Sequence, residues 1–185
     1  GAFDITSGVL KRLYNFKDGM SSLPSSAQIK SARAKAGYEK IILTDNNYIS
    51  LTVAGMHISF GAIGKGYAAD KVKKLFQQRG VRSGVISASG DLTAWGLRSD
   101  GSPWKIGIAD PDDTSKAIVV LQLDNVSVAT SGNYEQYFEI NGHRYSHNID
   151  PKSGLPVRGI KSATVVSPKA ELSDALATAV TVMGV

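Results

Sequence analysis

The alternation of apolar and polar residues along this chain predicts many short strands. Runs rich in β-branched and aromatic residues recur between turn signals, which is typical of strands. We expect strands at 40–44, 48–53, 84–88, 92–97, 104–108, 117–123, 126–129, 136–140, 143–146 and 162–167. Asn141-Gly142 is the strongest two-residue hairpin signal in the sequence. Strands joined by such turns pair antiparallel.

A helical period is found in only three segments. The first is capped by Ser25 or Ser26 and runs to about residue 35. The second covers 64–78, with its apolar residues gathered on one face, and the third begins at Glu171. Because strands outnumber helices and occur in hairpins, we predict an α+β fold with a mixed, largely antiparallel sheet packed with helices.

Composition narrows the class of protein. The chain has 185 residues and a net charge of +5, and it contains no cysteine. Disulfides and thiolate metal sites are therefore excluded. The lysines and arginines are scattered rather than striped, so we expect no nucleic-acid partner. A basic surface would also suit an anionic small molecule.

The two ends of the sequence are unusual. The chain opens at Gly1 without a methionine or an apolar leader, and it stops at 181–185 within an apolar, helical pattern. We therefore expect a single domain over 1–185, truncated at both ends.

Two glycine-containing segments are candidate ligand loops. Gly61-Ala62-Ile63-Gly64-Lys65-Gly66 lies between an expected strand and an expected helix. Its glycines would let the backbone approach an anion at the helix start, but tight packing between strand and helix explains them about equally well. The second segment, 87–91, contains Ser89-Gly90-Asp91, and a plain turn is the favoured interpretation there.

A histidine in a loop and one pair of oxygen groups on a helix are candidates for chemistry. His147 lies in a turn-rich loop with Asp150, beyond the hydroxyl-rich segment 129–134, and could act as a general base. It could equally be an inert, hydrogen-bonded histidine. Asp174 and Thr178 share one helix face and offer the hard oxygen ligands that Mg²⁺ prefers. Without further context, a helix N-terminal acid and a threonine bonded to its own backbone explain that pair better.

Taken together, these segments resemble the ApbE family of FAD:protein FMN transferases. The matching motifs are GAFDITSG (1–8), GAIGKGYAAD (61–70), SGD (89–91), ATSG (129–132), YSHNIDP (145–151) with Gly154 and Pro156, and DALATA (174–179). They span the chain in this order, which makes the resemblance specific.

The resemblance implies an activity and a set of site residues. Members split FAD with Mg²⁺ and transfer FMN to a Ser or Thr hydroxyl of an acceptor protein, releasing AMP. Acceptors are typically subunits of membrane redox complexes. Carried over by motif, the FAD contacts are Ala2, Phe3, Asp4, Lys65 and Ile149; the Mg²⁺ ligands are Ala62, Asp174 and Thr178; and the catalytic base is His147.

Some features depart from the family pattern or leave alternatives open. Ser59 stands where members usually carry an acid, and Ser89 replaces a glycine. The family's N-terminal part, usually with a lipoprotein signal, is absent from this sequence. An FAD pyrophosphatase producing FMN and AMP, and a non-catalytic FAD-binding protein, are the alternatives. By resemblance, we expect the periplasmic side of the cytoplasmic membrane, with a lipid anchor on the full-length protein.

Overall fold

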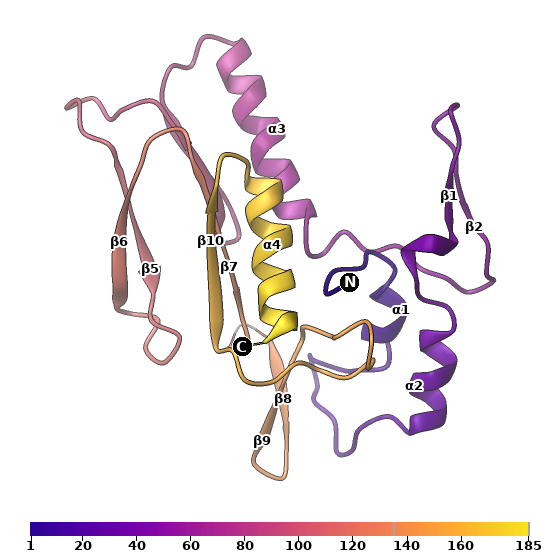
Figure 1. Cartoon of the computed structure of the whole chain (residues 1–185). Helices are drawn as coiled ribbons and strands as arrows, with labels where there is room; N and C mark the ends of the chain where they lie inside the picture. Colours follow the sequence, from indigo (N-terminus) through magenta and orange to yellow (C-terminus); the bar gives the residue numbers. More distant parts are fainter. Residues whose placement is uncertain (135, 185) are drawn as a thin grey trace. The chain divides into compact units, whose positions relative to one another are not determined.

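The computed structural model describes residues 1–134 and 136–184, and it shows an α+β fold of short helices and antiparallel strand pairs (Figure 1). The helices are α1 (Gly8–Lys11), α2 (Ser26–Arg33), the 3₁₀ turn η1 (Tyr38–Lys40), α3 (Gly64–Gln78) and α4 (Ala170–Met183). The strands are β1 (Ile41–Leu43), β2 (Ile49–Leu51), β3 (Gly84–Ala88), β4 (Asp91–Trp95), β5 (Trp104–Ala109), β6 (Ala117–Leu123), β7 (Ser127–Gly132), β8 (Tyr137–Ile140), β9 (His143–Ser146) and β10 (Ser162–Ser167). All strand pairs in the described ranges are antiparallel, which confirms the predicted fold class.

The differences from the predicted elements have local causes. The helix α1 was not predicted, because a helix of four residues is too short to establish a period. The strand β7 continues to Gly132 instead of ending at Ala129, since β10 pairs with it over its whole length. Pairing in three dimensions therefore extends β7 through a polar segment that sequence pattern alone would place in a loop.

The contacts divide the chain into two compact units. The first consists of Gly1–Phe60, Asn133–Ile160 and the described residues from Ala179 onward; the second consists of Gly61–Gly132 and Lys161–Thr178. The expectation of a single domain over the whole chain stays a prediction. None of the described helices is long and apolar enough to cross a bilayer.

An aromatic cluster forms the core of the first unit. Leu10 of α1, Ala32 of α2 and Phe138 of β8 are buried together with Tyr14 and Ile149. The rings of Tyr14 and Phe138 are stacked, with their centroids 6.3 Å apart. The Tyr14 hydroxyl also donates a hydrogen bond to the carbonyl oxygen of Gly154 at 2.7 Å. This core therefore fixes the loop that follows β9.

The second unit is built on a four-stranded antiparallel sheet. Its strand order is β10-β7-β4-β3, and α3 packs against β3 and β4. The β5–β6 hairpin lies on the face of this sheet opposite the helices (Figure 1). An apolar core joins hairpin and sheet, with Ala94, Ile108, Leu123 and Val128 buried in it.

The helix-facing side of the same sheet is unusually polar. Residues of β4 alternate between the two faces, so Asp91 and Thr93 point to one side, and Leu92 and Ala94 to the other. Thr93 accepts a hydrogen bond from the ammonium of Lys73 on α3 at 3.2 Å, which shows that this side faces the helix. Asp91 is therefore directed toward the helices by the register of β4.

Candidate functional site

The N-terminal ends of α3 and α4 lie against each other in the second unit. A Cβ placed on Gly66 would be 2.2 Å from the backbone oxygen of Ala170, so only glycine fits this close approach. The carboxylate of Asp70 accepts hydrogen bonds from the backbone nitrogens of Ala170 and Glu171, both at 3.0 Å. A carboxylate of α3 thus caps α4, where the helix dipole favours negative charge.

The reverse contact is made by Asp174. Its Oδ2 atom accepts a hydrogen bond from the backbone nitrogen of Gly66 at 3.1 Å, in the first turn of α3. The Asp174 residue is only 5% exposed. Each helix therefore supplies a carboxylate that binds amides in the first turn of the other helix, and Asp174 is held rigidly by this contact.

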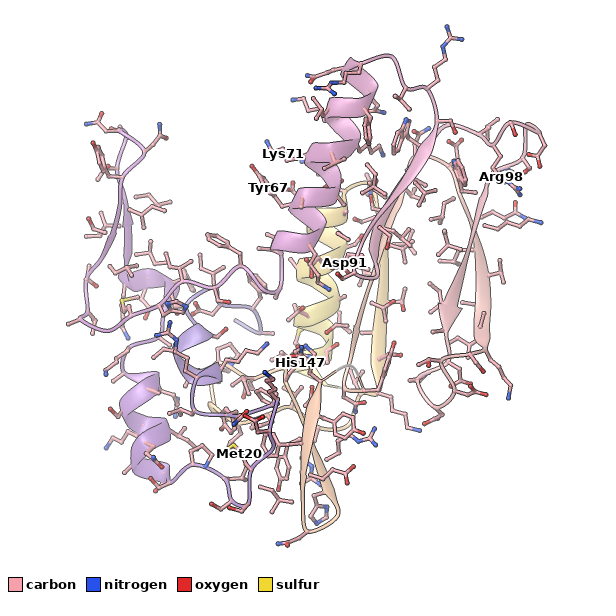
Figure 2. The ribbon with its side chains drawn as sticks, turned by 180° about the vertical axis from the view of Figure 1, so that it is seen from behind. Met20, Tyr67, Lys71, Asp91, Arg98 and His147 are labelled. Atoms are coloured by element: carbon pink, nitrogen blue, oxygen red, sulfur yellow. The ribbon has the colours of Figure 1, made fainter. Side chains whose placement is uncertain are left out.

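A second buried carboxylate lies beside Asp174. Asp91, the first residue of β4, forms an ion pair with Lys65, with Oδ2 and Nζ 2.9 Å apart. The Lys65 side chain is 35% exposed and that of Asp91 is 2% exposed. The Oδ2 atom of Asp91 is buried, and its contact with Lys65 is an ion pair without hydrogen-bond geometry. Figure 2 shows Asp91 beside the first turn of α3.

The surroundings of Asp174 raise its proton affinity. Burial raises the pKa of Asp174 to about 6. The neighbouring Asp91 acts on the pKa of Asp174 in the same direction as burial, while the hydrogen bond from Gly66 and the charge of Lys65 lower it, and the value of about 6 includes all of these effects. The cluster brings two buried acidic side chains together with one lysine side chain, so it offers carboxylate oxygens to a cation.

The donor set of this cluster fits a hard divalent cation. Thr178 lies one turn after Asp174 on α4, and Ala62 lies in the loop that leads into α3. No group of three or more acidic or histidine side chains suited to a metal occurs in the part of the chain that the structure describes. Mg²⁺ requires no such group, because it commonly binds one or two carboxylates and completes its shell with water and phosphate oxygens. The buried Asp91 oxygen and the raised pKa of Asp174 agree with a site built for positive charge.

The predicted FAD-contacting residues at the start of the chain lie in the first unit. The Oδ1 atom of Asp4 accepts hydrogen bonds from the backbone nitrogen and the hydroxyl of Thr6, at 2.8 and 2.7 Å. Its Oδ2 atom accepts one from the backbone nitrogen of Tyr38 at 3.2 Å. Ala2 and Phe3 precede it, and both are half-buried.

Asp4 also lines a pocket of about 460 Å³ in this unit. Lys30, Arg33 and Pro151 are among the other lining residues, so the pocket carries more positive than negative charge. Ile149, the remaining FAD contact expected in this unit, is buried in the aromatic core and pairs with Pro156 in an isolated bridge. Its side chain therefore holds the loop in place.

His147 is oriented by a backbone carbonyl. Its Nδ1 atom lies 3.2 Å from the carbonyl oxygen of Gln136, which also accepts the backbone N–H of His147 at 3.0 Å. Since a carbonyl oxygen can only accept, Nδ1 carries the proton, and in the neutral ring Nε2 is the basic nitrogen. Asp150 is engaged elsewhere, because its carboxylate accepts hydrogen bonds from the backbone nitrogens of Lys152 and Ser153.

Of the predicted site residues, the structure brings Lys65 and Asp174 into one cluster, with Thr178 and Ala62 on neighbouring segments of the same unit. The sequence analysis weighed the Ser89-Gly90-Asp91 segment but favoured a plain turn and assigned Asp91 no site role, since a carboxylate at the end of a Ser-Gly turn is common in surface turns. The available signal was the period of β4, which places Asp91 on the same face as the buried Thr93.

Comparison with known proteins gives a consistent result. The model of the ApbE family matches residues 1–185. The FAD:protein FMN transferase of Salmonella typhimurium is 33% identical over 191 residues, covering 100% of this chain and 55% of that protein. This chain therefore spans about half the length of the curated relatives that it matches.

Solved structures show the same likeness. The flavinyl transferase ApbE of Pseudomonas stutzeri in its apo form has a TM-score of 0.87 and 37% identity, covering 100% of this chain and 58% of that one. The ApbE protein of Thermotoga maritima has a TM-score of 0.90 and 37% identity, covering 99% of this chain and 60% of that one.

Proposed function

This chain belongs to the ApbE family, and on that premise we propose that it takes part in Mg²⁺-dependent transfer of FMN from FAD to an acceptor protein. The acceptor group is a Ser or Thr hydroxyl. The hydroxyl oxygen forms a new bond to the phosphorus of the FMN moiety, the bond from that phosphorus to the bridging oxygen breaks, and AMP leaves. FAD is the substrate and Mg²⁺ the metal cofactor.

The observation that carries the proposal is the cluster of Lys65, Asp91 and Asp174. It places one ammonium group and two buried carboxylates at the first turn of a helix, where amides attract anions. Cleavage of a pyrophosphate needs positive charge both on the phosphates and next to the leaving group. A cluster that can bind a phosphate and a divalent cation at once meets this need.

The residues of this unit have distinct proposed roles. Asp174 would hold Mg²⁺ by its carboxylate, Thr178 by its hydroxyl and Ala62 by its backbone carbonyl. When bound, the metal ion would neutralise charge on the pyrophosphate oxygens. Lys65 would contact a phosphate of FAD directly, together with amides at the start of α3.

The residues of the other unit would bind flavin and move a proton. Ala2, Phe3, Asp4 and Ile149 are proposed FAD contacts. His147 would accept the proton of the acceptor hydroxyl at Nε2, because the carbonyl of Gln136 holds the proton of the ring at Nδ1. Deprotonation makes the hydroxyl oxygen a stronger nucleophile.

Mass spectrometry of an acceptor domain tests the proposal. The domain is incubated with the full-length protein, FAD and Mg²⁺, and a parallel sample contains EDTA. We expect covalent FMN on a Ser or Thr and release of AMP only in the sample with Mg²⁺. Free FMN and AMP beside an unmodified acceptor would instead indicate a pyrophosphatase, and intact FAD would indicate a non-catalytic binding protein.

We further propose where the protein works and on what. By family resemblance, the acceptor is a subunit of a membrane redox complex, and the full-length protein is lipid-anchored on the periplasmic side of the cytoplasmic membrane. Protease digestion of intact spheroplasts should degrade a protein in that position. Protection from protease until the membrane is broken would contradict this location.

A further inference from the structure

Asp91 belongs to the polar cluster but has no role of its own among the residues assigned to the proposed function. It follows a tight turn in which Ser89 and Gly90 have positive φ angles of 53° and 96°. This turn starts β4, and the register of β4 directs the Asp91 side chain to the helix-facing side of the sheet. There Asp91 is 1% exposed, an unusual environment for a carboxylate in the first residue after a turn.

A buried carboxylate is costly unless it is paired. The partner of Asp91 is the ammonium of Lys65, 2.9 Å from its Oδ2 atom. The two residues belong to different segments, one in the first turn of α3 and the other at the start of β4. The ion pair therefore ties the position of the Lys65 side chain to the sheet.

The location of Lys65 is itself unfavourable without a partner. The first turn of a helix carries partial positive charge, so a lysine there is repelled by the helix dipole and would turn toward solvent. Lysine also loses considerable rotamer freedom when its ammonium is fixed. Asp91 offsets both effects, because its negative charge holds the ammonium next to the amides of the first turn.

We propose that Asp91 is a positioning residue that presets Lys65 to bind a phosphate of a dinucleotide diphosphate. The inference rests on the proposed function, since FAD is the diphosphate in question. Protein kinases use the same physical principle, in which an acidic residue of another element holds the phosphate-binding lysine. Because Asp91 already orders the Lys65 side chain before the substrate binds, less binding free energy is lost in ordering it.

A double-mutant cycle on FAD affinity tests this role. The variants of the full-length protein are Asp91→Asn, Lys65→Met and the double variant, and calorimetry is done in EDTA so that no turnover occurs. Asp91→Asn should weaken FAD binding by about tenfold, because Lys65 would no longer be held in place for its charge-assisted contact with the phosphate. In the Lys65→Met background, Asp91→Asn should cause no further loss, because the group that it positions is already gone.

The cycle separates positioning from a purely structural role. If Asp91→Asn weakened FAD binding equally in both backgrounds, or left it unchanged when Lys65 is present, the inference would be overturned. The double variant guards against misfolding, since it leaves neither an unpaired buried carboxylate nor an unpaired ammonium. Thermal unfolding of each variant identifies loss of folded protein.

A matched control comes from another Asp–Lys pair of the same unit. Asp113 and Lys116 form an exposed ion pair at 2.8 Å, so Asp113→Asn should leave FAD affinity unchanged. If the unaltered protein failed to bind FAD, the proposed function would fail, and this inference with it. If Lys65→Met alone weakened binding and Asp91→Asn did not, only the inference would fail.

Discussion

The carboxylate of Asp174 accepts a hydrogen bond from the backbone nitrogen of Gly66 at 3.1 Å, which joins α4 to the first turn of α3, a helix far apart in sequence. A second contact joins the same two helices in the reverse sense, because Asp70 of α3 caps the start of α4. This reciprocal capping fixes Asp174 next to Asp91 and Lys65. The predicted metal ligand is therefore part of the helix packing itself.

The unfolding free energy of the metal-free protein should depend on the protonation of Asp174. The folded-state pKa is raised from 3.8 to about 6, so the folded state binds more protons than the unfolded state between these values. The contribution of Asp174 is therefore present below about pH 4 and lost as pH rises to about 6, at about 1.4 kcal/mol per pH unit.

Comparison with Asp174→Asn isolates this effect from other titrating groups. Urea unfolding in EDTA at several pH values should show the unaltered protein losing stability relative to the variant as pH rises from about 4 to about 6. Above that range the difference should be constant. Parallel pH profiles for the two proteins would mean that Asp174 is already charged below this range.

Replacing Asp174 with alanine should abolish Mg²⁺-dependent turnover while sparing much of the FAD binding. The proposed metal ligand is lost, whereas the proposed flavin contacts Ala2, Phe3, Asp4 and Ile149 belong to other segments of the chain. Turnover assays over a Mg²⁺ series, together with FAD titration, measure the two effects. Glu171→Gln is the control, since the Glu171 side chain pairs with Lys169 on the same helix end. Normal turnover by Asp174→Ala would mean that the metal site is misplaced.

Gly66→Ala should destabilise the protein although alanine favours helices. Propensity alone predicts a gain of about 0.5–1 kcal/mol in the free energy of unfolding. The added Cβ would instead lie 2.2 Å from the backbone oxygen of Ala170, which forces α3 and α4 apart. We expect a net loss of about 1–3 kcal/mol, typical of overpacking. Urea unfolding measures the change in the free energy of unfolding. An increase in that free energy would contradict the close approach of the two helices.

His147→Ala should slow transfer without weakening FAD binding. Loss of a general base typically lowers the rate by about 10²–10⁴-fold. His143→Ala is the matched control, because His143 lies on the preceding strand and is exposed. Single-turnover assays with acceptor and FAD measure both variants. Equal rates for the two would remove His147 from the proposed mechanism.

The sequence by itself determined those turns and helices that depend on local interactions. Asn141 and Gly142 have φ angles of 51° and 75°, as the predicted two-residue hairpin requires. Ser25 caps α2 in a capping box with Gln28, although the helix ends at Arg33, earlier than expected. The helix α3 has the predicted bounds. In each case the residues that determine the element lie within a few positions of one another.

Only the tertiary structure shows the polar cluster and the burial of Asp91 within it. Lys65, Asp91 and Asp174 come from a helix start, a strand start and a second helix, and only the packing of these elements brings their charges together. A pattern of apolar residues predicts which faces are buried, but it does not predict which buried polar groups pair. Pairing depends on the register of β4 and on the close approach at Gly66, and both are set by contacts between segments distant in sequence.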